Sequence, residues 1–150
     1  MSSEIKNNFV LVTGASGGVG SSICERLLID GWTVGVCTRD RESKRIEKLE
    51  SLGVSNIRVF EFDMTDYSAV DSVATDIKEW CGGKLNGLVN NAAVAHGGLI
   101  QSTKLDDVKS VFETNLFSIL YLTQKMHRYL RRANGSAIIN MSSIASIAPG

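Results

Sequence analysis

The sequence predicts an α/β domain in which helices cover both faces of a parallel β-sheet. Short apolar runs alternate with longer segments of helical periodicity between residues 9 and 141, and such alternation implies right-handed crossovers between parallel strands. The apolar runs are uniformly hydrophobic, as expected of strands that are buried on both faces. A glycine-rich turn directly follows the first run. We therefore expect a doubly wound, Rossmann-type sheet with the strand order 3-2-1-4-5.

The glycine-rich turn separates the first predicted strand, residues 9–12, from a helix predicted over residues 19–30. Four apolar residues share one face of this helix and a glycine ends it; they are Val19, Ile23, Leu27 and Leu28, with Gly31 as the stop. The apolar run at residues 33–37 is predicted to be the second strand.

A charged amphipathic helix is predicted over residues 41–52, with Ile46, Leu49 and Leu52 on one face and Gly53 at its end. Basic and acidic side chains alternate around it, which favours a solvated helix face. The basic residues of this cluster are Arg39, Arg41, Lys44, Arg45 and Lys48. The third strand is predicted at residues 57–62. The next helix, residues 67–80, has an apolar face of Val70, Val73, Ile77 and Trp80.

The last predicted elements are a strand at residues 85–90, a long helix over residues 105–131 and a fifth strand at residues 136–141. Thr103 and Asp106 have the spacing of a capping box for the long helix. No linker, internal repeat or low-complexity segment interrupts this order. Residues 1–150 are therefore predicted to form a single domain.

The composition indicates a globular domain without a nucleic-acid or membrane partner. Hydrophobic residues make up 43% of the chain and charged residues 21%, which is enough for a core. The 16 basic and 16 acidic side chains balance to zero net charge, so no nucleic-acid or acidic-lipid surface is predicted. Residues 1–8 lack an apolar signal core, and no apolar run approaches membrane-spanning length. Cys24, Cys37 and Cys81 are scattered, which favours free thiols in the cytoplasm over disulfides or a metal site.

The glycine-rich turn, residues 13–20, has the local architecture of a dinucleotide-binding site. Its glycines let the backbone approach a pyrophosphate, and the first turn of the next helix offers free N–H groups and a positive dipole end. Gly14, Gly18 and Gly20 follow the pattern Gly-x-x-x-Gly-x-Gly, which differs from the commoner Gly-x-Gly-x-x-Gly.

The carboxyl ends of all five predicted strands are polar or glycine-rich, although the strands themselves are apolar. In an open parallel sheet, ligands bind outside these ends. The residues that follow the strands are 13–20, then Thr38, Arg39 and Asp40, then Asp63 and Met64, then Asn90, Asn91, Ala92 and Ala93, and finally Ser142 and Ser143. Their coincidence predicts one ligand site at this edge.

In order and spacing, these motifs resemble the short-chain dehydrogenase/reductase family, and most of all its 3-oxoacyl-[acyl-carrier-protein] reductase-type members. The motifs are Thr13-Gly14-x-x-x-Gly18-x-Gly20, Asp63, Asn90-Asn91-Ala92-Ala93, Asn115 in Glu-Thr-Asn-Leu, and Asn140-Met141-Ser142-Ser143. Ala93 stands where the family usually has glycine. The resemblance runs from Phe9 to the last residue and implies the N-terminal part of a longer family member.

The resemblance also implies roles for particular residues. The implied cofactor-binding residues are Gly14, Ser16, Gly17, Gly18, Val19, Gly20, Arg39, Asp63, Met64, Asn90 and Ala92. Among them, Asp63 would bind the adenine amino group, although it could instead cap the next helix, as could Asp66. Asn115 would help to hold a catalytic lysine through a water, or make a structural hydrogen bond. Ser143, chosen over Ser142 by alignment with the family pattern, would bind the substrate oxygen.

The residues after the second strand favour NADP(H) over NAD(H). Thr38 stands where NAD-preferring relatives tend to have aspartate, and Arg39 follows it. A planar guanidinium suits the 2′-phosphate of NADP. Against this, the glycine turn has Gly17 where NADP-preferring relatives often have a basic residue, and Asp40 adjoins Arg39.

The resemblance predicts hydride transfer between the nicotinamide of NADP(H) and a small-molecule carbonyl or alcohol, such as a 3-oxoacyl thioester, a sugar or another ketone. The full-length form is expected to be a homodimer or homotetramer. The family's Tyr-x-x-x-Lys pair lies downstream of the serine, so these 150 residues alone are expected to be inactive. Tyr121 and Lys125 match that spacing upstream, which we interpret as chance. The alternative is a non-catalytic NADP-binding module.

Overall fold

In residues 8–53 and 55–144, which the computed structural model describes, five strands form one parallel sheet in the order β3-β2-β1-β4-β5. The strands are β1 (Phe9–Thr13), β2 (Thr33–Thr38), β3 (Ile57–Glu61), β4 (Gly87–Asn90) and β5 (Ala137–Asn140). The helices are α1 (Gly18–Ile29), α2 (Lys44–Leu52), α3 (Tyr67–Trp80), α4 (Leu105–Phe112) and α5 (Ser118–Arg132), with a 3₁₀ turn η1 (Ile100–Ser102) and a π-helical turn η2 (Glu113–Phe117). The predicted Rossmann-type class and strand order are confirmed.

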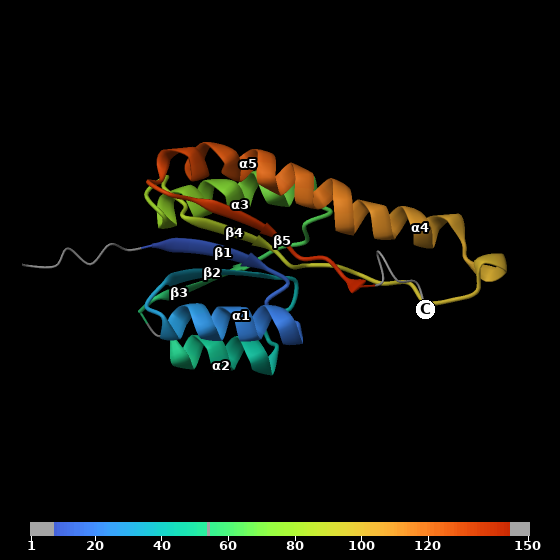
Figure 1. Ribbon diagram of the computed structural model, residues 1–150, viewed down its shortest axis with the longest axis horizontal. Coiled ribbons are helices and arrows are strands. Elements are labelled where there is room, and N and C mark those ends of the chain that lie inside the picture. The colour runs from blue at the N-terminus through green and yellow to red at the C-terminus, as the bar shows by residue number, and fades with distance from the viewer. Residues whose placement is uncertain (1–7, 54, 145–150) are drawn as a thin grey trace, which may run out of the picture.

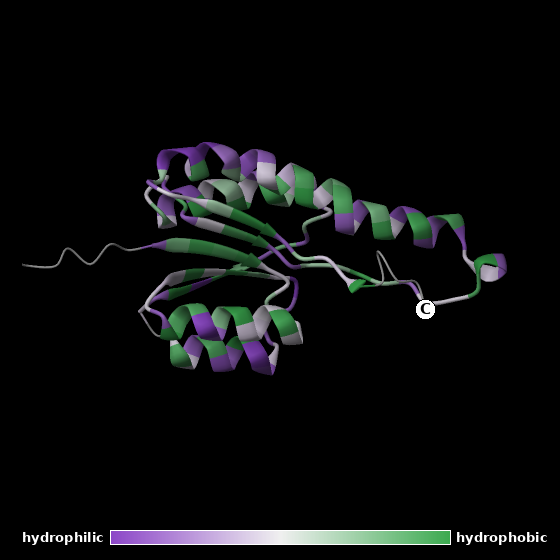
Figure 2. Cartoon of the chain, in the orientation of Figure 1, coloured by the Kyte–Doolittle hydropathy of each residue, from purple (hydrophilic) through white to green (hydrophobic). Residues whose placement is uncertain are grey.

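The helices lie in two layers, with α1 and α2 on one face of the sheet and α3 and α5 on the other (Figure 1). Successive residues of β1 show why its sequence is uniformly apolar. Val10 and Val12 pack into the cluster on the α1–α2 side, whereas Leu11 packs into the cluster on the α3–α5 side. Because strand side chains alternate between faces, both sets must be hydrophobic. Figure 2 shows the strands as largely hydrophobic and the last turns of α5 as hydrophilic.

The predicted helix over residues 105–131 is not one continuous α-helix. It consists of α4, the π-turn η2 and α5, which ends at Arg132. The hydroxyl of Ser118 donates to the carbonyl oxygen of Thr114 at 2.7 Å within this region. The side chain of Asn115 bonds the backbone of Val94, on a distant loop. Such π-turns occur frequently at functional sites, and helical periodicity alone did not reveal this one.

The predicted capping box at the start of the long helix is wrong. Lys104 is the N-cap of α4, and no side chain caps it among the described residues. The hydroxyl of Thr103 instead donates to the carbonyl of Leu99 at 3.0 Å. These two residues flank η1, a turn before α4 that the sequence did not predict.

Two other helix details differ from expectation. α2 begins at Lys44 rather than at residue 41, because Arg41 lies in the preceding turn, where its backbone N–H meets a carboxylate oxygen of Glu61 at 3.4 Å. The predicted apolar faces are also incomplete, since Val19 and Leu52 are 59% and 51% exposed.

Within the described ranges, no helix is both long and apolar enough to cross a bilayer.

Candidate functional site

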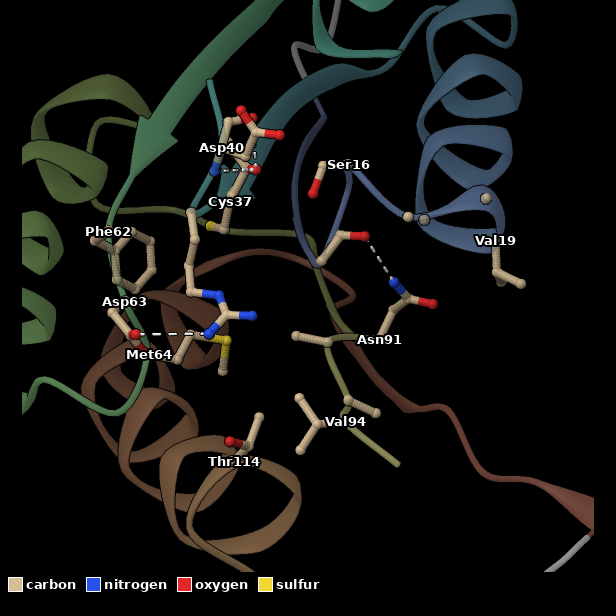
Figure 3. Close-up of a pocket in the computed structure, with 18 residues that line it drawn as sticks. Ser16, Val19, Cys37, Asp40, Phe62, Asp63, Met64, Asn91, Val94 and Thr114 are labelled. Carbon is tan, nitrogen blue, oxygen red and sulfur yellow. Dashed lines mark hydrogen bonds and ion pairs between the residues drawn. The ribbon is translucent and has the colours of Figure 1, made fainter. Parts of the chain in front are cut away.

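A pocket of about 480 Å³ opens at the carboxyl ends of the central strands. Its walls come from the glycine turn and the start of α1, from the ends of β2 and β3, and from the segment after β4 (Figure 3). Of the predicted cofactor-binding residues, all except Asn90 line it: Gly14, Ser16, Gly17, Gly18, Val19, Gly20, Arg39, Asp63, Met64 and Ala92. Residues that are distant in sequence are therefore brought together at this edge of the sheet.

Packing explains two of the three motif glycines. Gly14 has a φ of +66°, and a Cβ there would lie 2.8 Å from the Cα of Ala92. A Cβ on Gly20 would lie 2.3 Å from the carbonyl oxygen of Gly14. Gly18 differs, because a Cβ there would meet no described atom within 4 Å. Packing within the described residues gives no reason for glycine at Gly18, whereas close approach of a ligand to the first turn of α1 would give one.

The start of α1 is suited to binding an anion. Gly17 is its N-cap, and no side chain from the described residues caps the helix. Gly18, Val19 and Gly20 form its first turn and line the pocket. The N–H groups of a first helical turn have no partner within the helix, and the helix dipole is positive at that end. A phosphate group in the pocket would meet both features.

Thr13 and Asn91 lock the glycine turn to the end of β4. The hydroxyl oxygen of Thr13 accepts hydrogen bonds from the backbone N–H groups of Asn91 and Ala92, both at 3.0 Å. The side-chain amide of Asn91 donates to the carbonyl of Thr13 at 2.9 Å and to that of Gly14 at 3.2 Å. Figure 3 shows the bond to Gly14. Both residues belong to the motifs found in the sequence, which predicted no role for either of them. The signal was present, because each is a polar residue next to the apolar end of a strand.

Arg39 and Asp63 face each other across the β2–β3 side of the pocket. A guanidinium nitrogen of Arg39 lies 3.7 Å from Oδ2 of Asp63, as the dashed line in Figure 3 shows. Oδ1 of Asp63 accepts from the N–H of Thr65 at 2.8 Å and from its hydroxyl at 2.7 Å. The Thr65 bonds, with a smaller effect of the Arg39 charge, hold the pKa of Asp63 below its usual value. The pocket therefore carries a fixed carboxylate beside a cation.

The residue that caps α3 is Asp66. Its Oδ1 accepts hydrogen bonds from the backbone N–H groups of Ser68 at 3.0 Å and Ala69 at 3.1 Å. The hydroxyl of Ser68 also donates to Oδ1, and together these bonds lower the pKa of Asp66. Asp63 lies outside the cap, in the turn that precedes it.

The structure does not bring Asn90 to the pocket. Its side chain is buried, and its amide nitrogen donates to Oδ1 of Asn140 at 2.8 Å and to the hydroxyl of Thr123 at 3.3 Å. The carbonyl oxygen of Asn90 accepts from the N–H of Met141 in the sheet. Asn90 therefore joins β4 to β5 and α5, while its predicted contact with a cofactor remains a prediction.

The side chain of Asn115 makes two hydrogen bonds with one residue. Its Oδ1 accepts from the N–H of Val94 at 2.9 Å, and its Nδ2 donates to the carbonyl of Val94 at 2.8 Å. Val94 lines the pocket, as does Thr114, the neighbour of Asn115 on η2. Asn115 therefore fixes the segment after β4 against the π-turn, which is the structural interpretation left open by the sequence.

Ser142 and Ser143 follow the end of β5 and are exposed, and neither lines the pocket. Tyr121 and Lys125, which match the Tyr-x-x-x-Lys spacing, are also outside it. The hydroxyl of Tyr121 donates to Oδ1 of Asp71 at 2.9 Å, and the ammonium of Lys125 pairs with the same oxygen. Asp71 is on α3, so this pair ties α3 to α5.

Comparison with known proteins gives a consistent result. A family model described as "short chain dehydrogenase" matches residues 8–150. The chain is 36% identical over 145 residues to the NADPH-dependent 3-dehydrocapnine reductase of Ornithobacterium rhinotracheale, covering 93% of this chain and 50% of that protein. It is 32% identical over 143 residues to the 3-oxoacyl-[acyl-carrier-protein] reductase FabG of Staphylococcus epidermidis, covering 92% and 57%. The chain thus spans about half the length of the curated relatives it matches.

A solved structure shows the same arrangement of elements. The NADPH-bound carbonyl reductase from chicken fatty liver superimposes with a TM-score of 0.85 at 31% sequence identity. The match covers 93% of this chain and 60% of the carbonyl reductase.

Proposed function

This chain belongs to the short-chain dehydrogenase family, and we propose that its 150 residues form the single NAD(P)-binding domain of an NADP(H)-dependent oxidoreductase. One observation carries the proposal: a single pocket combines a guanidinium with a helix N-terminus that no described side chain caps and with a glycine at which a Cβ would meet no described atom within 4 Å. Its volume of about 480 Å³ lies within the range of small-molecule and cofactor sites.

The pocket residues fit a dinucleotide from one end to the other. The pyrophosphate would rest on the turn from Gly14 to Gly20 and on the first N–H groups of α1. Asp63, with Met64 beside it, would accept a hydrogen bond from the adenine amino group. Ala92, held by Thr13, would lie toward the nicotinamide. Asn90, which does not line the pocket, is proposed for the same end of the cofactor. When bound, the nicotinamide supplies or accepts the hydride, while the protein supplies position and proton transfer.

We infer a preference for NADP(H) over NAD(H) from the end of β2. Thr38 has no carboxylate to accept a hydrogen bond from a ribose 2′-hydroxyl. Its own hydroxyl is engaged with the backbone of Asp40, at 3.0 Å and 3.1 Å. Arg39, the next residue, presents a guanidinium to the pocket. A phosphate dianion can accept two hydrogen bonds from this group, whereas a neutral hydroxyl gains much less.

The proposed reaction is hydride transfer between the nicotinamide and the carbonyl or alcohol carbon of a small molecule, such as a 3-oxoacyl thioester, a sugar or another ketone. Ser143 would hydrogen-bond the substrate oxygen, and Asn115 would help to position the catalytic lysine. We further propose that the full-length protein is a cytoplasmic homodimer or homotetramer.

The decisive experiment uses the full-length protein. Dissociation constants for NADPH and NADH are measured by fluorescence titration, and NADPH consumption is then screened with acetoacetyl thioesters, sugars and steroid ketones. Tight NADPH binding with turnover that Ser143→Ala abolishes supports the proposal. Binding without turnover of any carbonyl supports the non-catalytic module instead, and absence of binding of either cofactor refutes both.

A further inference from the structure

A cation reaches the glycine turn from a different element. The turn itself has no basic residue, since Gly17 occupies the relevant position. However, a guanidinium nitrogen of Arg45, on α2, lies 3.5 Å from the carbonyl oxygen of Ser16. Ser16 lines the same pocket as Arg39. The structure thus places a second guanidinium beside Ser16, at the rim of the pocket but outside its lining. The solvated-face interpretation of the basic cluster did not foresee this position.

Two members of the basic cluster are paired with glutamates, whereas Arg45 is not. Arg41 pairs with Glu50 at 3.0 Å, and Lys48 pairs with Glu25 at 3.2 Å. Arg45 forms no salt bridge with any described residue, and its only described hydrogen bond goes to the neutral carbonyl of Ser16. At 3.5 Å that bond exceeds the usual N–H···O range. A phosphate oxygen would replace it readily.

Charge balance at the rim favours a second cation. The guanidinium of Arg39 already faces the carboxylate of Asp63 at 3.7 Å, and Asp40 adds another carboxylate to the pocket lining. An incoming phosphate dianion would be repelled by both acids and attracted by Arg39 alone. Because the interaction of charges falls off with distance, a cation close to the phosphate, such as one at the glycine turn, would offset this repulsion.

We propose that Arg45 binds the 2′-phosphate of NADP(H) together with Arg39. This inference rests on the proposed function. With the pyrophosphate on the first turn of α1 and the adenine beside Asp63, the adenosine ribose lies between them. Ser16 and Arg39 both line the pocket, and they would flank this ribose. Two guanidinium groups, each with several N–H donors, then bind the phosphate from α2 and from the end of β2.

The test compares Arg45→Gln with Lys44→Gln in the full-length protein. Lys44 is the exposed neighbour of Arg45 on α2, so both variants lose the same charge, but only one loses the group that reaches Ser16. Dissociation constants are measured by calorimetry for NADPH, NADH, adenosine 2′,5′-bisphosphate and 5′-ADP. Arg45→Gln should weaken NADPH and the bisphosphate about tenfold, as expected for loss of a charge-assisted hydrogen bond. NADH and 5′-ADP should bind as in the wild type, and Lys44→Gln should change little.

Three results would overturn the inference. If Arg45→Gln binds NADPH as tightly as the wild type while Arg39→Ala binds it more weakly, Arg45 does not bind the phosphate. The proposed function is unaffected by that result. Equal weakening of NADPH and NADH assigns Arg45 a structural role, and circular dichroism of the variant checks its fold. Failure of the wild-type protein to bind either cofactor refutes the proposed function and the inference together.

Arg45→Lys, which keeps the charge without the planar fork, should give an NADPH affinity between those of the wild type and Arg45→Gln.

Discussion

Gly18→Ala should separate cofactor binding from folding. A Cβ at this position meets no described atom within 4 Å, so the fold accepts it without strain. Alanine is also the better helix former, by at most about 1 kcal/mol, because it loses less backbone entropy than glycine. The melting temperature should therefore stay unchanged or rise by up to about 2–4 °C.

The same methyl group should obstruct the cofactor. If phosphates rest on the first turn of α1, the Cβ occupies their path and lengthens the N–H contacts. Losing a charge-assisted hydrogen bond costs about 1.5–3 kcal/mol, which corresponds to roughly ten- to hundredfold weaker NADPH binding. Fluorescence titration of the full-length variant measures this loss, and thermal melting followed by circular dichroism measures the fold.

Gly20→Ala is the matched control, because its Cβ would lie 2.3 Å from the carbonyl oxygen of Gly14 and 2.6 Å from Nδ2 of Asn91. Overpacking of this kind costs about 1–3 kcal/mol, so this variant should lose stability and binding together. Wild-type NADPH affinity in Gly18→Ala would refute the placement of phosphates on α1.

Three further outcomes are expected. Asp63→Asn frees Arg39 from an exposed ion pair worth no more than about 1 kcal/mol and removes a carboxylate that repels the phosphate, so the ratio of NADPH to NADH affinity should rise up to about fivefold; an equal rise in an Arg39→Ala background would show that the lost repulsion alone, and not the ion pair, accounts for it. Asp66→Ala should lower the melting temperature at neutral pH, whereas Asp66→Asn should retain the cap. Because the folded-state pKa of Asp66 is lowered, its stabilisation is present above the unfolded pKa of about 4 and is lost as the pH falls through the folded-state value, so melting curves of wild type and Asp66→Ala should converge in acid. Asn115→Ala leaves the N–H and carbonyl of Val94 without their partners and should reduce the free energy of unfolding by about 1–3 kcal/mol in urea titration; wild-type stability would show that Val94 finds other partners.

The sequence was sufficient to locate the strands, because a buried parallel strand leaves an unbroken apolar run. Their order followed from the doubly wound fold class. It also predicted the edge of the sheet at which the pocket opens, since parallel strands place their carboxyl ends together. Details that depend on distant partners were not accessible in this way. The π-turn between α4 and α5 contains Asn115, whose side chain is hydrogen-bonded to the backbone of Val94, 21 residues away. The capping box failed because η1 redirected the hydroxyl of Thr103.

The basic cluster shows why a charge pattern alone cannot separate binding residues from solvated ones. Arg41, Arg45 and Lys48 are similar in sequence, and all three side chains are exposed. Their surroundings differ, because Glu50 and Glu25 neutralise two of them, while the third reaches the backbone of the glycine turn. The partners of Arg45 and Lys48 depend on how α2 is packed beside α1 and the glycine turn, a tertiary relation that periodicity does not contain. Since an arginine without a carboxylate partner retains its full attraction for an anion, the packing of α2 decides where the second cation of the pocket comes from.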